Sequence, residues 1–168
     1  KRSHGGPSAG TRNLIPANGG VGIHLFVAGS TGNVIEGNYI GTDADGTGAL
    51  GNVYGVKIDG GAEGNRVGTD GDGTADDGER NVISGNETGI LFFGGGATVQ
   101  GNFIGIDAAG VAAVPNTTGI TAQGSDNTIA RTISEAGHVI ALNTNGRFVR
   151  VGQPPTILGN SHHHTHSL

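Results

Sequence analysis

Cysteine, methionine and tryptophan are absent from this 168-residue chain, and aromatic residues make up only 4% of it. Without cysteine no disulfide can hold the fold together, so packing and hydrogen bonds must do so. No apolar run approaches the ~18 residues of a membrane-spanning helix, so no span is predicted. Basic residues are few: Lys1 and Lys57 are the only lysines, and the formal net charge is −5. With no basic stripe to follow phosphates, nucleic acid is not an expected partner.

What the chain has instead is glycine, at 35 positions, and a phrase that it repeats. R-N-L-I at 12–15 returns as R-N-V-I at 80–83 and, in a looser form, as G-H-V-I at 137–140. A period this long is typical of a stacked repeat architecture. Extending the alignment divides the chain into two super-repeats and a truncated third: 12–79, 80–136 and 137–160.

Within each copy, apolar residues alternate with other residues. G-I-H-L at 22–25, G-V-K-I at 55–58 and G-I-L-F at 89–92 place apolar residues at i and i+2, the spacing of a strand. Val and Ile outnumber Leu, which favours strands, and Gly and Asn between these segments favour tight corners. The predicted fold is all-β: a right-handed parallel β-helix over residues 1–160. At roughly 20–30 residues per rung, about six or seven rungs are expected.

The motifs N-V-I-x-G-N, I-G-T-D and G-[IV]-x-[IL] resemble the right-handed parallel β-helix (pectate-lyase-like) repeats of large secreted and surface proteins of bacteria. The resemblance covers about residues 5–160 and implies a secreted or cell-surface location. It leaves function open, because that family includes polysaccharide lyases, glycosidases, epimerases, adhesins and phage tailspikes. With no methionine and no evident end caps, we expect a fragment of a longer repeat protein. The His-rich segment 161–168 is interpreted as a tag-like or disordered tail, with a natural terminus as the alternative.

The strongest candidate site is the acidic loop D-G-D-G-T-A-D-D at 70–77, where carboxylates alternate with glycines. Calcium prefers about six to eight oxygen ligands supplied by a flexible loop, so calcium is the predicted cofactor. The predicted ligands are Asp70, Asp72, Asp76, Asp77 and Glu79. The spacing departs from that of an EF-hand. The alternative is a solvated acidic turn, since the matching loop of the second super-repeat keeps only Glu135.

Asp43, Asp70 and Asp107 each close an [IV]-G-[TI]-D motif, so three equivalent aspartates are expected along one edge of the solenoid. Glycosidases use paired carboxylates, and a lyase needs a base with charge neutralisation. However, a residue that recurs with its turn is more simply explained as a turn cap, and we favour that role. The weak catalytic candidates are Asp43, Asp107, Lys57 and His24.

Three further groups follow from the strand periodicity. An outward column is expected to contain His24, Lys57, Leu91 and Thr121. Tyr39 and Phe103 occupy matching places on another face, where aromatic rings can stack on sugars. Recurring asparagines are expected to form a hydrogen-bonded ladder from rung to rung; they are Asn33, Asn38, Asn65, Asn81, Asn86, Asn102, Asn127, Asn143 and Asn160.

The leading hypothesis is a non-catalytic segment of a larger secreted or cell-surface protein. It would act as a structural spacer, adhesive or glycan-contacting scaffold, and its partners would be glycans or the rest of a longer repeat protein. The alternative is a carbohydrate-active enzyme, a polysaccharide lyase, glycoside hydrolase or epimerase, acting on acidic polysaccharide. No serine-hydrolase, nucleotide-binding or zinc motif is present in the sequence.

Overall fold

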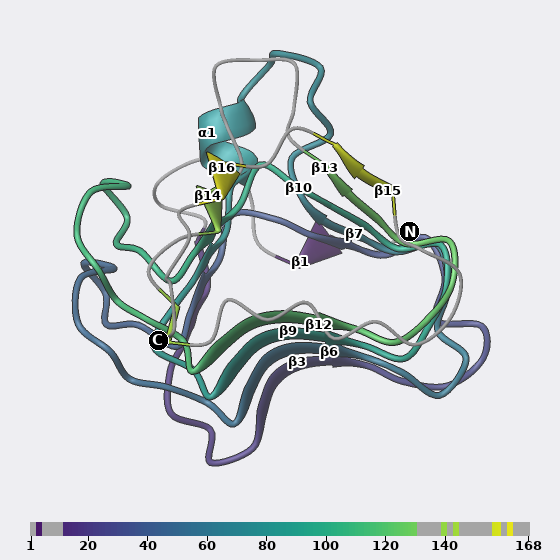
Figure 1. The fold of residues 1–168 in the computed structure, drawn as a ribbon, viewed down its shortest axis with the longest axis horizontal. Coiled ribbons are helices and arrows are strands. Elements are labelled where there is room, and N and C mark those ends of the chain that lie inside the picture. Colours follow the sequence, from purple (N-terminus) through teal and green to yellow (C-terminus); the bar gives the residue numbers. More distant parts are fainter. Residues whose placement is uncertain are drawn as a thin grey trace.

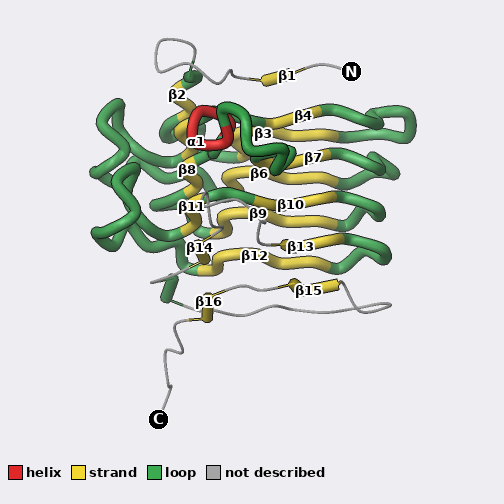
Figure 2. Tube along the Cα trace, turned by 90° about the horizontal axis from the view of Figure 1, so that it is seen from above, coloured by secondary structure: helices red, strands yellow, loops and turns green. Residues whose placement is uncertain are grey.

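Three parallel sheets make up the fold, and the chain visits them in turn as it coils around one axis (Figures 1 and 2). The computed structural model describes residues 3–4, 12–130, 139–140, 143–144, 156–158 and 161–162. Sheet A consists of β1 (Ser3–His4), β4 (Val34–Ile35), β7 (Arg66–Gly68), β10 (Thr98–Gln100), β13 (Thr128–Ala130) and β15 (Thr156–Leu158). Sheet B consists of β2 (Leu14–Ile15), β5 (Tyr39–Ile40), β8 (Val82–Ile83), β11 (Phe103–Ile104), β14 (Val139–Ile140) and β16 (Ser161–His162). Sheet C consists of β3 (Val21–Leu25), β6 (Tyr54–Ile58), β9 (Thr88–Phe92) and β12 (Thr118–Ala122).

The prediction of an all-β parallel β-helix is confirmed. The expected six or seven rungs are wrong, because the solenoid makes about three turns, from β3 to β12. Most turns use more chain than expected: hydrogen-bonded asparagines on successive rungs at the corner between sheets B and C are 34, 34 and 30 residues apart. The additional residues lie in corner loops rather than in longer strands.

Successive turns differ in their loops, and this difference accounts for the long sequence period. At the corner between sheets B and C, the short loops 16–20 and 84–87 alternate with the long loops 41–53 and 105–117. Sequence equivalence therefore recurs every second turn, although structural equivalence recurs every turn.

The two ends of the chain are described only in part. In the predicted third super-repeat, β14 continues sheet B and β15 continues sheet A. In the segment 161–168, β16 pairs in parallel with β14, and the other residues lie outside the described part of the chain. The predicted domain boundaries and the tag-like or disordered tail stay predictions.

The core is a narrow column of stacked aliphatic side chains. In-register parallel pairing places equivalent residues above one another: Ile40, Ile83 and Ile104 in sheet B, for example, are all fully buried. Sheets C and A contribute further members of the same cluster, among them Val56, Ile58, Ile90, Phe92, Ile35, Val67, Val99 and Ile129. Each rung contacts mainly its two neighbours, so stability depends on stacking.

Asparagine ladders reinforce this stacking, as predicted. At the corner between sheets A and B, each side-chain amide Nδ2 donates to the Oδ1 of the next rung at 2.9, 3.0 and 2.8 Å. The residues follow the order Asn13, Asn38, Asn81 and Asn102. The last three are completely buried, so the hydrogen bonds between rungs also satisfy amides that have no access to water.

A second ladder joins the rungs at the corner between sheets B and C. Its Nδ2–Oδ1 distances are 3.0, 3.1 and 2.9 Å along Asn52, Asn86, Asn116 and Asn143. Sequence reasoning missed Asn52 and Asn116, because both close long loops that have no counterpart one rung away. Asn160 lies outside the described residues.

A third ladder, at the corner between sheets C and A, is interrupted. Asn33 Nδ2 donates to Asn65 Oδ1 at 3.0 Å. Ala97 occupies the next rung, where its backbone N–H donates to Asn127 Oδ1 at 2.9 Å. Asparagines thus lie at all three corners, and at each corner their side chains form hydrogen bonds with the backbone of a neighbouring rung.

Candidate functional site

The acidic loop lies at the corner between sheets A and B, where the chain passes from β7 to β8 (Figure 1). It contains the helix α1 (Asp76–Glu79), a single turn preceded by Ala75 in the left-handed conformation (φ 59°). Among the described residues no helix is long and apolar enough to cross a membrane. Two local hydrogen bonds shape the loop: Asp72 N–H donates to Asp70 Oδ1 at 3.2 Å and Thr74 N–H to Asp72 Oδ1 at 2.7 Å.

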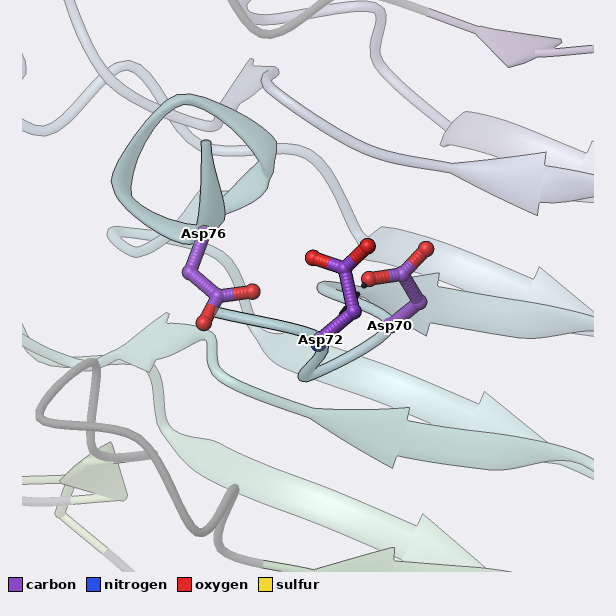
Figure 3. A group of neighbouring side chains, drawn as sticks. All are labelled: Asp70, Asp72 and Asp76. Atoms are coloured by element: carbon purple, nitrogen blue, oxygen red, sulfur yellow. Dashed lines mark hydrogen bonds between the residues drawn. The ribbon is translucent and has the colours of Figure 1, made fainter. Parts of the chain in front are cut away.

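Three of the five predicted metal ligands come together. Asp70, Asp72 and Asp76 each present one carboxylate oxygen, and these oxygens all lie within 4.8 Å of one another (Figure 3). Asp76 is buried, with 6% of its surface exposed, whereas Asp70 and Asp72 are exposed. Carboxylates this close repel one another, and a hard cation with oxygen ligands relieves that repulsion.

The other two predicted ligands form ion pairs elsewhere. Asp77 Oδ1 lies 3.0 Å from Arg80 Nη2. Glu79 Oε2 accepts a hydrogen bond from Asp70 N–H at 3.1 Å and lies 3.6 Å from Arg66 Nη1. Burial and the neighbouring carboxylate of Asp70 raise the pKa of Glu79. Glu79 therefore joins the end of the loop to its start through Asp70 N–H, and Asp77 pairs with Arg80 and does not join the three clustered aspartates.

Asp43 and Asp107 cap equivalent long loops. Asp107 Oδ1 accepts hydrogen bonds from the backbone N–H groups of Val111 and Ala112 at 2.8 and 3.1 Å. Asp43 Oδ1 accepts one from Thr47 N–H at 2.9 Å. Backbone hydrogen bonds lower the pKa of both aspartates: those of Gly48 and Thr47 at Asp43, and those of Val111 and Ala112 at Asp107. Each carboxylate thus has a structural task within its own loop.

Asp70 is not equivalent to these two, which corrects the expectation of three aspartates along one edge. Asp43 and Asp107 follow sheet B and lie at its corner with sheet C, whereas Asp70 follows sheet A. The [IV]-G-[TI]-D motif recurs at different corners because a glycine with positive φ ends a strand at each: Gly41, Gly105 and Gly68. The motif therefore marks a strand end and not a place on the solenoid.

The predicted outward column is present on sheet C. His24, Lys57, Leu91 and Thr121 pair in register on successive rungs. His24 and Lys57 converge on Asp59: His24 Nε2 lies 2.7 Å from Asp59 Oδ1, and Lys57 Nζ lies 2.6 Å from Oδ2. Burial raises the pKa of Asp59, but the hydrogen bonds from Lys57 and His24 outweigh it and lower the pKa overall.

Sequence reasoning missed Asp59 as a member of this cluster. It stands two residues after Lys57, just past the end of β6, so an alternation extended beyond the strand would have placed it on the same face. Leu91, the next member of the column, is buried with 6% of its surface exposed. The polar cluster therefore ends after two rungs.

Tyr39 and Phe103 lie in one column of sheet B, each paired with Val82 between them. Both rings are covered by long loops. A Cβ on Gly46 would lie 3.2 Å from the Tyr39 ring, and one on Gly110 would lie 2.9 Å from the Phe103 ring. These glycines allow the loops to fold onto the rings, so the aromatic pair anchors loops.

Comparisons of the chain with protein-family models, curated protein sequences and solved structures find no match. The fold assignment therefore rests on the strand topology, which shows a parallel β-solenoid. The likeness to pectate-lyase-like repeats rests on the sequence motifs.

Proposed function

We propose that this chain is a non-catalytic β-helix segment of a longer, pectate-lyase-like secreted or cell-surface repeat protein. It acts as a structural spacer and as a scaffold that contacts glycans. The observation that supports the proposal is that the recurring polar residues form hydrogen bonds within the solenoid itself. Asparagines at three corners bind the next rung, and the paired candidates Asp43 and Asp107 bind their own loops.

Turnover of acidic polysaccharides tests this proposal. The chain is incubated with polygalacturonate and alginate, and new reducing ends and unsaturated uronate are measured. We expect neither product. Turnover by the wild-type chain that Lys57→Ala abolishes would overturn the proposal in favour of an enzyme, because Lys57 and His24 both lie within hydrogen-bond distance of the Asp59 carboxylate.

Glycan contact is supported by exposed aromatic rings at the edge of sheet C. Phe26 and Phe93 directly follow β3 and β9 and have 53% and 49% of their surface exposed. Phe26 follows β3, which carries His24, and Phe93 follows β9, where the column continues with the buried Leu91. Aromatic faces stack on the apolar face of sugar rings.

Phe93→Ala measures this contribution against a matched control. We expect weaker retention on immobilised polysaccharide for Phe93→Ala than for the wild-type chain. Val111→Ala removes an apolar group that is 80% exposed on a long loop at another corner, and should leave retention unchanged. Equal retention of all three proteins would show that Phe93 does not contribute to glycan binding.

We also propose that calcium stabilises the acidic loop, with Asp70, Asp72 and Asp76 as ligands. The support is their convergence within 4.8 Å. Calcium that binds only the folded chain raises its stability by mass action, by about 2.7 kcal/mol at a concentration 100 times the Kd. A bound ion would also tie α1 to the end of β7.

Thermal melting with calcium and with a chelator tests the calcium site. The wild-type chain should melt at a higher temperature with calcium, and Asp72→Asn should lose that increase. Asp45→Asn, which removes one exposed carboxylate from another loop, should keep it. If calcium leaves the wild-type melting temperature unchanged, the loop is a solvated turn.

A further inference from the structure

A pocket with a volume of about 300 Å³ lies on the outside of sheet B, between the acidic corner and the long loop 105–117. Two arginines line it together with apolar and aromatic side chains: Arg12, Arg80, Tyr39, Val82, Phe103 and Ala108. Val82 and Phe103 are buried and form a small hydrophobic cluster separate from the main core. Pockets of this size accept small ligands.

Arg12 brings a positive charge that no described carboxylate neutralises. Its Nη1 and Nη2 donate to the backbone carbonyls of Arg80 and Asp77, both at 3.0 Å. Its guanidinium carbon lies 5.2 Å from the centre of the Tyr39 ring. A guanidinium has five N–H donors, and two of them are used by these neutral acceptors.

Arg80 brings the second charge. Its guanidinium carbon lies 4.1 Å from the centre of the Phe103 ring, and its Nε donates to the Gly101 carbonyl at 3.2 Å. Its carboxylate partner is Asp77, whose side chain is 86% exposed, whereas the Arg80 side chain is only 14% exposed. Burial, with the like charge of Arg12, lowers the pKa of Arg80.

The balance of charge in the pocket is therefore positive, although the whole chain carries −5. The lining holds two guanidinium groups and one carboxylate, that of Asp77, which pairs with Arg80 and is the more exposed of the two partners. The Asp76 carboxylate also acts on Arg80, from outside the lining. Arginine pairs carboxylates through two parallel N–H donors, and such charge-assisted bonds are stronger when water is excluded. The apolar wall beneath the arginines excludes water from one side.

We propose that this pocket binds a small organic anion that has one carboxylate and a flat, apolar body. The carboxylate would lie between the guanidinium groups of Arg12 and Arg80, in competition with Asp77 for Arg80. The body would pack against Val82, Phe103 and Ala108. A single carboxylate would balance the net charge of the Arg12, Arg80 and Asp77 side chains that line the pocket. A flat apolar body would fit against the small part of Val82 and Phe103 that the long loop and Arg80 leave uncovered.

Benzoate is the probe, measured by NMR titration with a chelator present, so that bound cations at the acidic loop do not contribute. We expect benzoate to bind, and neither benzyl alcohol nor inorganic phosphate to bind as well. Arg12→Gln should weaken benzoate binding by about tenfold or more, because a hydrogen bond to a charged group contributes about 1.5–3 kcal/mol. Lys57→Gln removes the same charge from sheet C and should leave binding unchanged.

The variant Asp77→Asn distinguishes a ligand-binding role of the two arginines from a purely structural one. Removing the competing carboxylate should tighten benzoate binding several-fold, whereas arginines that only hold the loops together would gain nothing. Arg12→Lys, which keeps the charge but loses the two-pronged donor, should bind with intermediate affinity. Wild-type binding by Arg12→Gln, weaker binding by Asp77→Asn, or equal binding of benzyl alcohol or phosphate would overturn the proposal. If Arg12→Gln fails to fold, Asp77→Asn and Arg12→Lys decide it.

Discussion

Two corners of the solenoid use polar side chains in opposite ways. At the corner between sheets B and C, Asn52, Asn86 and Asn116 are buried, and each bonds to the rungs before and after it. At the acidic corner between sheets A and B, Asp70 and Asp72 are exposed, and their carboxylates accept hydrogen bonds from N–H groups of the loop itself. Asn81 and Asn102 continue a ladder past that same corner.

The difference shows that the acidic loop is an addition to a complete rung. The ladder satisfies the backbone whether the loop is long or short: residues 69–81 and 101–102 both connect sheet A to sheet B. Polar residues that recur are therefore part of the stacking, and polar residues that do not recur are available for ligands. Three experiments test this division, from the largest expected effect to the smallest.

The first tests how closely the backbones of neighbouring rungs approach. Gly68 ends β7 with φ +98°, and a Cβ there would overlap the Gln100 carbonyl of the next rung. Gly68→Ala should lower the free energy of unfolding by about 4 kcal/mol, from overpacking and a left-handed backbone together. Gly64 has φ +62°, and no atom lies within 4 Å of the place that a Cβ would take, so Gly64→Ala should cost only about 1 kcal/mol. Equal urea midpoints for Gly68→Ala and Gly64→Ala would show that the neighbouring rung can move to accommodate the added methyl group.

The second tests the ladder itself. Asn86→Ala removes the acceptor of Asn52 N–H and Nδ2 and the donor to the Ile40 carbonyl, all of them buried. We expect a loss of about 3 kcal/mol in unfolding free energy, because buried groups are left without partners. Asn18→Ala is the control, since the backbone N–H of Asn18, which this change keeps, is the group that joins the ladder. A urea midpoint for Asn86→Ala within error of the control would contradict the structural role.

The third tests the loop caps by acid titration. Backbone hydrogen bonds lower the folded-state pKa of Asp107. Its contribution to stability is therefore present above the unfolded pKa of about 4 and is lost as the pH falls through the lower, folded pKa. When the pH is lowered below about 4, the melting temperature of Asp107→Asn should therefore fall less than that of the wild-type chain. Asp45→Asn should keep the wild-type pH profile; identical profiles for all three would show that the cap does not titrate.

Much of the fold followed from the sequence because a solenoid is almost one-dimensional. In a parallel stack each side chain lies above its equivalent in the next rung. The sequence repeats every second turn, so residues that the repeat aligns lie in one column, two rungs apart. Ile40 and Ile104 show this in the core, with Ile83 on the rung between them, and Asn38 and Asn102 show it at a corner, with Asn81 between them. The number of rungs did not follow, because corner loops take up a variable share of the chain.

The candidate sites followed less well, because they depend on loops of unequal length. The motif shared by Asp43 and Asp70 placed them on one edge, yet they lie at different corners. The contact between Asp59 and His24, which are 35 residues apart in the sequence, became apparent only in the folded structure.

The sequence by itself determined the parallel coil, its stacked core and most members of its asparagine ladders, since their residues recur at matching places in the super-repeats. Only the tertiary structure brought Arg12 to the backbone of Arg80, 68 residues away, and collected three of five acidic residues into one cluster. Both arrangements depend on where non-repeating loops fold against the stack, and that is set by contacts in three dimensions that no period in the sequence encodes.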